Sequence, residues 1–262
     1  MVISHKHRYL FIEIPQTASW SIRNELVELY DGQLILHKHA TYPEFEAFAT
    51  SGERDYFAFA TTRNPLDCLV SAYFKLTTDH KGVFSDAEAS VRDFKIDYAD
   101  KMAYEHYKKW GYSFEATLLA PRIWERPYSG MIDLSANNLD YVMRFERIQD
   151  DFAEALRLIG IKQQREVPAS NKTEGRKKSW ESMYSAEMIP KAKHIYGPYM
   201  EKWGYEFPRE WGGYEHSKLD EIGYRLSYFM KRIYLVHFQK SDNRIAEWVR
   251  RLNGVMKQQF YR

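Results

Sequence analysis

The sequence is short of the features that mark exported or membrane-spanning proteins. Its single cysteine, Cys68, excludes a fold held together by disulfides. No stretch approaches about 18 uninterrupted apolar residues, so we expect no segment to span a membrane. Residues 1–15 lack an apolar run followed by a small-residue cleavage site, which favours a cytoplasmic protein. Internal repeats and long Pro-, Gly- or Ser-rich linkers are missing as well.

An excess of one charge sign is also lacking over most of the chain. The 38 Lys and Arg residues nearly balance 36 Asp and Glu, for a net charge of +2. This balance argues against a nucleic-acid partner, because such binding needs a concentrated basic surface. The exception is residues 216–262, with four Lys and six Arg against two Asp and two Glu. We expect this basic tail to pack on its own domain, with contact to an anionic membrane surface or an acidic glycan as the alternatives.

The apolar and aromatic content, 44% and 16% of 262 residues, is sufficient for a large core. Strand, turn and helix patterns follow one another twice, which is typical of a parallel sheet. The expected strands are residues 9–14, 33–37, 56–61 and 141–145, and the expected helices are residues 20–30, 147–159, 185–203, one starting at Pro65 and several in 216–262. The sequence therefore predicts an α/β fold, a parallel sheet flanked by helices on both faces. We expect one α/β domain over residues 1–207 and a basic helical extension over 208–262.

The turn after the first strand lacks the glycines of common nucleotide-binding loops. Neither G-x-x-x-x-G-K-S/T nor G-x-G-x-x-G follows any expected strand, which excludes ordinary P-loop NTPases and argues against dinucleotide-dependent dehydrogenases. A strand that runs into a helix still presents backbone N–H groups and a positive dipole end. With hydroxyls from Thr17, Ser19 and Ser21, this turn predicts an anion cradle. The alternative is an ordinary serine helix cap.

The second strand–turn–helix unit, residues 59–73, places two polar side chains where they could meet one phosphate. Arg63 lies at the strand exit, and Ser71 follows eight residues later on the expected helix. Guanidinium and hydroxyl groups are good phosphate ligands. The alternative is a surface arginine at a helix N-terminus.

Together these segments resemble the sulfotransferases that use 3′-phosphoadenosine 5′-phosphosulfate (PAPS). The closest resemblance is to the carbohydrate branch that includes the heparan and chondroitin O-sulfotransferases. In that family the first loop reads like I-P-K-T-x-S/G-x-S and the second like R-N/D-P-x-x-R-L-V-S-x-Y; residues 14–21 and 63–73 correspond to them here. Further stretches agree in order and spacing over roughly residues 8–207: residues 36–41, 142–152, 171–173, 184–187 and 203–205.

The resemblance implies transfer of a sulfuryl group from PAPS to an acceptor hydroxyl, on a carbohydrate or glycoconjugate, with PAP as product and no metal. It implies that the first loop cradles the 5′ phosphosulfate end and that Arg63 and Ser71 hold the 3′-phosphate. Lys172 and Thr173 would close over the nucleotide. The residues assigned to nucleotide binding are Pro15, Gln16, Thr17, Ala18, Ser19, Trp20, Ser21, Arg63, Ser71, Lys172 and Thr173.

The acceptor hydroxyl needs a base, and two histidines are candidates. His37 and His39 are two residues apart, so in an extended segment they would project the same way. An imidazole titrates near neutral pH, which suits a general base. The resemblance places the catalytic histidine at His39, while His37 and Glu13 are the alternatives, and either histidine could simply be a solvated strand-end residue.

One departure from the family pattern affects the predicted chemistry. The loop lysine of the family is Gln16 here, which offers only a neutral hydrogen bond to the oxygen that leaves with negative charge. Arg23, Lys38 and Lys172 are candidates for a substitute cation. Without one, the alternative is a protein that binds PAP or PAPS with little or no catalysis. The basic residues 176–178 either help to hold the 3′-phosphate or form a solvated charged segment.

Overall fold

The computed structural model describes residues 1–85, 104–105, 107–109, 111, 113–119, 129–169, 173, 175–176, 178–233 and 248. The chain divides into two compact units, and each has a hydrophobic core of its own. Unit 1 comprises Met1–Asn64 and Tyr128–Lys172, and unit 2 comprises Pro65–Pro127 and Thr173–Arg262. The domain boundary expected after residue 207 stays a prediction.

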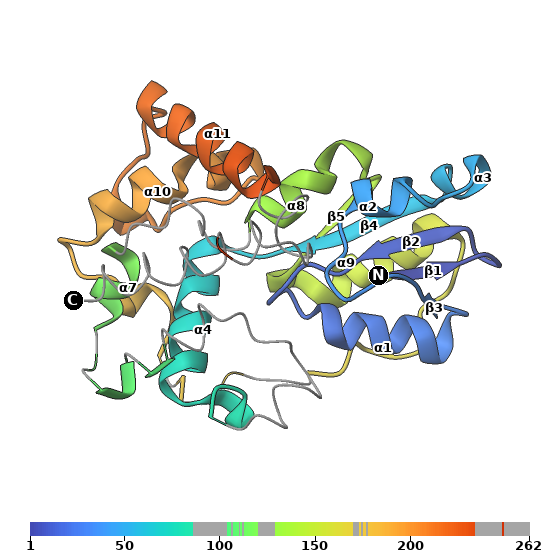
Figure 1. The fold of residues 1–262 in the computed structure, drawn as a ribbon, viewed down its shortest axis with the longest axis horizontal. Coiled ribbons are helices and arrows are strands. Elements are labelled where there is room, and N and C mark those ends of the chain that lie inside the picture. The colour runs from blue at the N-terminus through green and yellow to red at the C-terminus, as the bar shows by residue number, and fades with distance from the viewer. Residues whose placement is uncertain are drawn as a thin grey trace. The chain divides into compact units, whose positions relative to one another are not determined.

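A five-stranded sheet in the order β3-β1-β2-β4-β5 forms the centre of unit 1 (Figure 1). Its strands are β1 (Val2–Ser4), β2 (Tyr9–Ile12), β3 (Gln33–Leu34), β4 (Phe57–Thr62) and β5 (Tyr141–Arg144). The central strands β2, β4 and β5 are parallel, whereas β1 is antiparallel to both β2 and β3. The predicted α/β fold with helices flanking the sheet is confirmed, but the sheet is mixed rather than wholly parallel, because β1 runs antiparallel to its two neighbours.

Two details of the strand prediction are wrong. Strand β1 was not expected, because three residues are too few to show an alternating pattern; it lies between β3 and β2, and it pairs with β2 across a turn in which Arg8 has a φ of 53°. The strand expected over residues 33–37 ends at Leu34. Leu36 and His39 adopt left-handed φ values of 54° and 65°, which turn the chain out of the sheet.

Helices on both faces cover this sheet. Helices α1 (Ser19–Leu29) and α9 (Ile148–Ile159) pack on one face, where Ile22, Leu26 and Phe152 join one core with Phe11 and Phe59 of the strands. On the other side of the strands from α1 lie α2 and α8 (Figure 1). The remaining elements of this unit are α2 (Tyr42–Glu46), α3 (Ser51–Arg54), α8 (Ser129–Ser135), and the 3₁₀ turns η2 (Ala136–Asn138) and η3 (Phe145–Arg147).

The strand directions bring four chain exits to one edge of the sheet. Because β2 and β3 are both antiparallel to β1, they run in the same direction, which is also the direction of β4 and β5. The segments after Ile12, Leu34, Thr62 and Arg144 therefore leave the sheet at the same edge. Ligands of open α/β sheets bind outside the carboxyl ends of the strands, so this edge is the expected place for a site.

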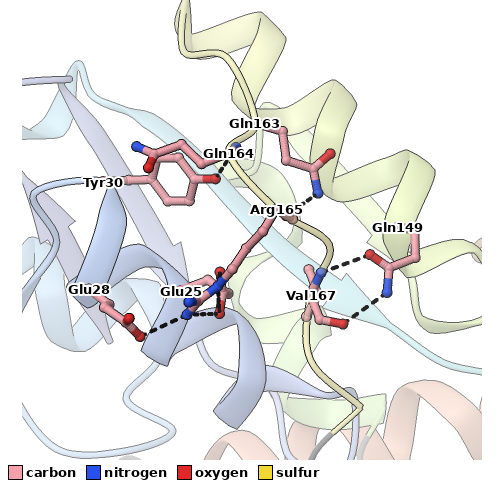
Figure 2. Close-up of polar contacts among 8 residues, drawn as sticks. All are labelled: Glu25, Glu28, Tyr30, Gln149, Gln163, Gln164, Arg165 and Val167. Carbon is pink, nitrogen blue, oxygen red and sulfur yellow. Dashed lines mark hydrogen bonds and ion pairs between the residues drawn. The ribbon is translucent and has the colours of Figure 1, made fainter.

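The segment that follows α9 is tied back to α1 and α9 by side-chain contacts (Figure 2). Arg165 donates to both carboxylate oxygens of buried Glu25 at 2.8–3.1 Å and to Glu28 at 2.8 Å. Gln149 and Val167 exchange two hydrogen bonds of 2.8 and 2.9 Å. These contacts fix where the basic loop after Val167 begins.

Unit 2 is helical over the residues that the structure describes. It contains α4 (Pro65–Thr77), α7 (Phe114–Leu119), α10 (Ile189–Lys202), α11 (Lys218–Ile233), and the 3₁₀ turns η1 (His80–Gly82), η4 (Glu181–Met183) and η5 (Arg209–Trp211). Leu66, Leu69 and Val70 of α4 pack against Ala192 and Tyr196 of α10. Among the described residues, no helix combines the length and apolar character needed to cross a bilayer.

Candidate active site

The loop after β2 is held in a strained conformation. Gln16 and Ala18 adopt left-handed φ values of 63° and 60°, which residues other than glycine rarely do. Buried Thr17 lies between them and donates its hydroxyl to the carbonyl oxygen of Ile14 at 2.9 Å. The Thr17 hydroxyl therefore shapes the loop from inside, whereas the sequence had suggested that it donates to a ligand.

The first turn of α1 follows this loop directly. Its N-cap is Ala18, and no side chain caps the helix, so the expected alternative of a serine cap is wrong. The first backbone hydrogen bond of α1 runs from the N–H of Ile22 to the oxygen of Ala18 at 3.2 Å, and the N–H groups of a helix's first turn point towards its N-terminal end. Ser19 and Ser21 are buried, and Trp20 is 36% exposed. The left-handed loop and the first turn of α1 together offer backbone N–H groups and the positive end of the helix dipole, which suit an anion.

Arg63 is attached to the same loop. It follows β4, and its Nη1 donates to the carbonyl oxygen of Gln16 at 2.9 Å. Its guanidinium carbon lies 4.0 Å from the ring centroid of Phe145, which follows β5, and the residue is only 9% exposed. The structure thus brings two sequence-predicted residues together and adds Phe145, which no sequence signal had singled out for this role.

His39, from the segment after β3, is also attached to the loop. Its Nδ1 donates to the carbonyl oxygen of Glu13 at 2.8 Å, which leaves the lone pair of a neutral ring on Nε2. The pKa of His39 is lowered to about 4, chiefly because the ring is buried; the hydrogen bond to the Glu13 carbonyl raises the pKa by less, and the charge of Lys38 adds to the lowering. The ring is therefore neutral at physiological pH and has the tautomer of a proton acceptor.

The two alternative bases are engaged elsewhere. Exposed His37 places Nδ1 2.7 Å from the carbonyl oxygen of Lys38 and Nε2 3.0 Å from Oε1 of Glu44, so both ring nitrogens face acceptors. Glu13 is 1% exposed, and its Oε1 lies 2.6 Å from the amino nitrogen of Met1. The other carboxylate oxygen of Glu13, Oε2, is buried and has no hydrogen-bond partner among the described residues, so it is an unpaired acceptor closed off from solvent. The left-handed backbone of His39 removes the extended segment in which the two histidines would have projected alike.

Two of the candidate cations meet on one aromatic ring. Lys38 Nζ lies 4.8 Å from the ring centroid of Trp20, and the guanidinium carbon of Arg23 lies 5.0 Å from it. Trp20 is in the first turn of α1, so both charges gather beside the loop. The sequence named these cations but gave no signal that Trp20 would join them.

Ser71 lies in unit 2, on the buried side of α4, where a loop arginine reaches it. Arg176 Nη1 donates to its hydroxyl at 3.1 Å, and Nη2 pairs with the carboxylate of Asp67 one turn earlier. The preceding Gly175 has a φ of 74°, and a Cβ there would lie 2.8 Å from Thr78 Cγ2, so only glycine fits this approach to α4. For Arg176, the solvated-segment alternative is wrong.

The other predicted residues are less informative. Thr173 is half-buried, and Lys178 is exposed. Lys172 and Lys177 lie outside the described residues. Within the part of the chain that the structure describes, no group of three or more His, Cys, Asp or Glu side chains is arranged to hold a metal ion.

The strained loop, the start of α1, Arg63 and His39 lie at the edge of the sheet where the parallel strands end, an arrangement that suits an anionic ligand. A comparison with protein families identifies the family of the chain. A model described as "Sulfotransferase family" matches residues 1–199, about three quarters of the chain, so the protein belongs to the sulfotransferase family. No curated protein and no solved structure matches the chain significantly.

Proposed function

We propose that this sulfotransferase uses PAPS as donor and transfers its sulfuryl group to a hydroxyl of a carbohydrate or glycoconjugate. The family membership supports sulfuryl transfer, and the first-loop and Arg63 motifs support the donor. The observation that carries the proposal is the double attachment of the loop after β2. His39 donates to the carbonyl oxygen of Glu13 and Arg63 to that of Gln16, so a base and a phosphate-binding cation share one support.

Each candidate residue has a role in this proposal. The backbone of residues 15–21 binds the 5′ phosphosulfate end, because its uncapped N–H groups suit an anion. Arg63 and Ser71 bind the 3′-phosphate, and Lys172 and Thr173 close over the nucleotide. The carbohydrate acceptor rests on the motif resemblance alone, so it is the part that an acceptor panel must decide.

The chemistry is a displacement at sulfur. The acceptor oxygen forms a new bond to sulfur while the bond from sulfur to the bridging phosphate oxygen breaks. The acceptor proton passes to Nε2 of His39, and the negative charge stays on the phosphate oxygen of the departing PAP. A neutral His39 with a free lone pair is ready for this role without prior deprotonation.

The test is turnover of radiolabelled PAPS with a panel of sugar, phenol and steroid hydroxyls, alongside calorimetric binding of PAP. We expect product with sugar hydroxyls, and we expect His39→Ala to lower kcat by about 10²–10⁴ with PAP affinity nearly unchanged. In the wild type, kcat/KM should fall with acid near the pKa of about 4. Wild-type-like turnover of the variant would assign the base to another residue.

A second outcome would change the functional class. Gln16 stands where the family places a lysine. Tight PAP binding without turnover on any acceptor would identify a nucleotide-binding protein that has lost catalysis. Failure to bind PAP at all would overturn the proposed donor.

A further inference from the structure

In the proposed reaction, negative charge develops on the phosphate oxygen that separates from sulfur, and a positioned cation stabilises that transition state. Gln16 cannot supply one, because its amide is neutral. Arg63, the cation attached to the loop, is directed to the carbonyl oxygen of Gln16. Another positive group beside the loop is needed for efficient transfer.

Two cations contact the ring of Trp20. Lys38 Nζ and the Arg23 guanidinium carbon lie 4.8 and 5.0 Å from the centroid of its ring. A contact with an aromatic face attracts a cation and holds it in one place. Both charges are therefore placed at the start of α1, where the loop delivers its N–H groups.

Lys38 and Arg23 differ in their position relative to the loop. Lys38 immediately precedes His39, and His39 is anchored to the loop through the Glu13 carbonyl. The ammonium of Lys38 and the ring of His39 are therefore attached to the same part of the loop, and the charge of Lys38 is one of the smaller causes that lower the pKa of His39. Arg23 lies one turn further along α1 on the same side as Trp20, where it supports the ring.

We propose that Lys38 is a catalytic residue that takes the place of the missing loop lysine, its Nζ donating to the bridging oxygen as the bond to sulfur breaks. Trp20 is the positioning residue that holds the ammonium beside the loop, and Lys38 and His39 then act on the two ends of one displacement. The proposal rests on the proposed sulfuryl transfer.

The experiment compares four variants of the full chain in single-turnover assays with PAPS. Lys38→Met, which keeps the length of the side chain and removes the charge, should slow transfer by about 10²-fold or more while PAP affinity falls less than about threefold. Arg23→Met is the matched control, because Arg23 contacts the same Trp20 ring, and it should slow transfer less than about threefold. Gln16→Lys alone places a second ammonium beside that of Lys38 and should lower the rate, because like charges repel.

The decisive variant is Gln16→Lys combined with Lys38→Met. A lysine on the loop should then restore at least about tenfold of the lost rate, because it returns the charge to the leaving oxygen from the other side. Restoration is an outcome that a merely structural role of Lys38 would not produce.

Three results would overturn the assignment. Normal single-turnover rates in Lys38→Met would show that its charge is not used, and a larger loss in Arg23→Met would transfer the role to Arg23. A double variant as slow as Lys38→Met would show that the missing element is not a cation. In all three the wild type is active, so the proposed function stands; a wild type that binds PAP and never transfers sulfuryl groups overturns both.

Discussion

His39 and the two left-handed residues of the β2 loop carry strain that their contacts maintain. A non-glycine residue at such φ values costs about 1 kcal/mol or more, and three of them lie at one edge of the sheet: Gln16, Ala18 and His39. Hydrogen bonds from Arg63, Thr17 and His39 to loop carbonyls hold the conformation in place. The loop is thus built to a fixed shape before any ligand arrives.

Ala18→Gly tests the strain directly. Glycine adopts left-handed φ values without steric cost, so the free energy of unfolding should rise by about 0.5–1 kcal/mol in chemical denaturation. Ala153→Gly in the middle of α9 is the matched control and should cost about 1 kcal/mol. If Ala18→Gly destabilises the protein as much as the control does, the Ala18 backbone is not strained.

His39 also predicts how stability depends on pH. Its pKa of about 4 in the folded protein lies below the ordinary value of 6.5, so the unfolded chain binds the proton first. The contribution of the neutral ring is complete above about pH 6.5 and is lost as the pH falls towards 4. It should amount to about 3 kcal/mol. Unfolding free energies measured from pH 7 to 4 should therefore fall less steeply for His39→Gln, which does not titrate. Parallel curves for the two proteins would contradict the assigned environment.

At the scale of elements, the contact between Arg165 and Glu25 attaches the segment after α9 to α1, and one substitution can break it. Glu25 is 1% exposed within α1, and the partly exposed Arg165 supplies its three charged hydrogen bonds (Figure 2). Removing Arg165 leaves a buried carboxylate without its counter-charge. Arg165→Met should therefore lower the melting temperature clearly more than Arg157→Met, which removes a pair with Glu154 on the surface of α9. Equal shifts would show that Glu25 finds another partner.

Elements with a long apolar period were predictable, whereas those fixed by backbone geometry were not. The helix expected over residues 20–30 is Ser19–Leu29, and the one expected over 147–159 is Ile148–Ile159. Both show buried residues at helical spacing over three turns. In contrast, β1 has three residues, and β3 ends early because Leu36 turns left-handed. A single non-glycine residue with positive φ leaves no mark in a hydrophobic pattern.

The sequence predicted which residues to consider for the candidate site, but it did not predict the contacts between them. The loop after β2, Arg63 and His39 could be named from the sequence, because each follows an expected strand at a fixed place in a motif. The direction of each side chain depends on partners far away in sequence, as when Arg63 reaches the oxygen of Gln16 or Arg176 reaches Ser71. Such contacts follow from tertiary packing, which one sequence does not display.

At the scale of the whole molecule, the residues predicted to bind the 3′-phosphate are divided between the two units. Arg63 lies in unit 1, and Ser71, with Arg176 on its hydroxyl, lies in unit 2. The prediction that both bind the same phosphate is tested by comparing PAP with adenosine 5′-phosphate, which lacks that group. Calorimetry with each single variant shows which unit the 3′-phosphate depends on.

Arg63→Ala should weaken PAP binding by about 2–4 kcal/mol, because a charge-assisted contact to phosphate is lost, and Ser71→Ala should weaken it by about 1–2 kcal/mol. Binding of adenosine 5′-phosphate should change much less in Ser71→Ala. In Arg63→Ala it should fall modestly, since Arg63 also holds the Gln16 carbonyl of the loop. Equal losses for both nucleotides in Arg63→Ala would mean that Arg63 acts only through the loop. Unchanged PAP binding in Ser71→Ala would place the 3′-phosphate with the residues of unit 1 and leave Ser71 as the partner of Arg176.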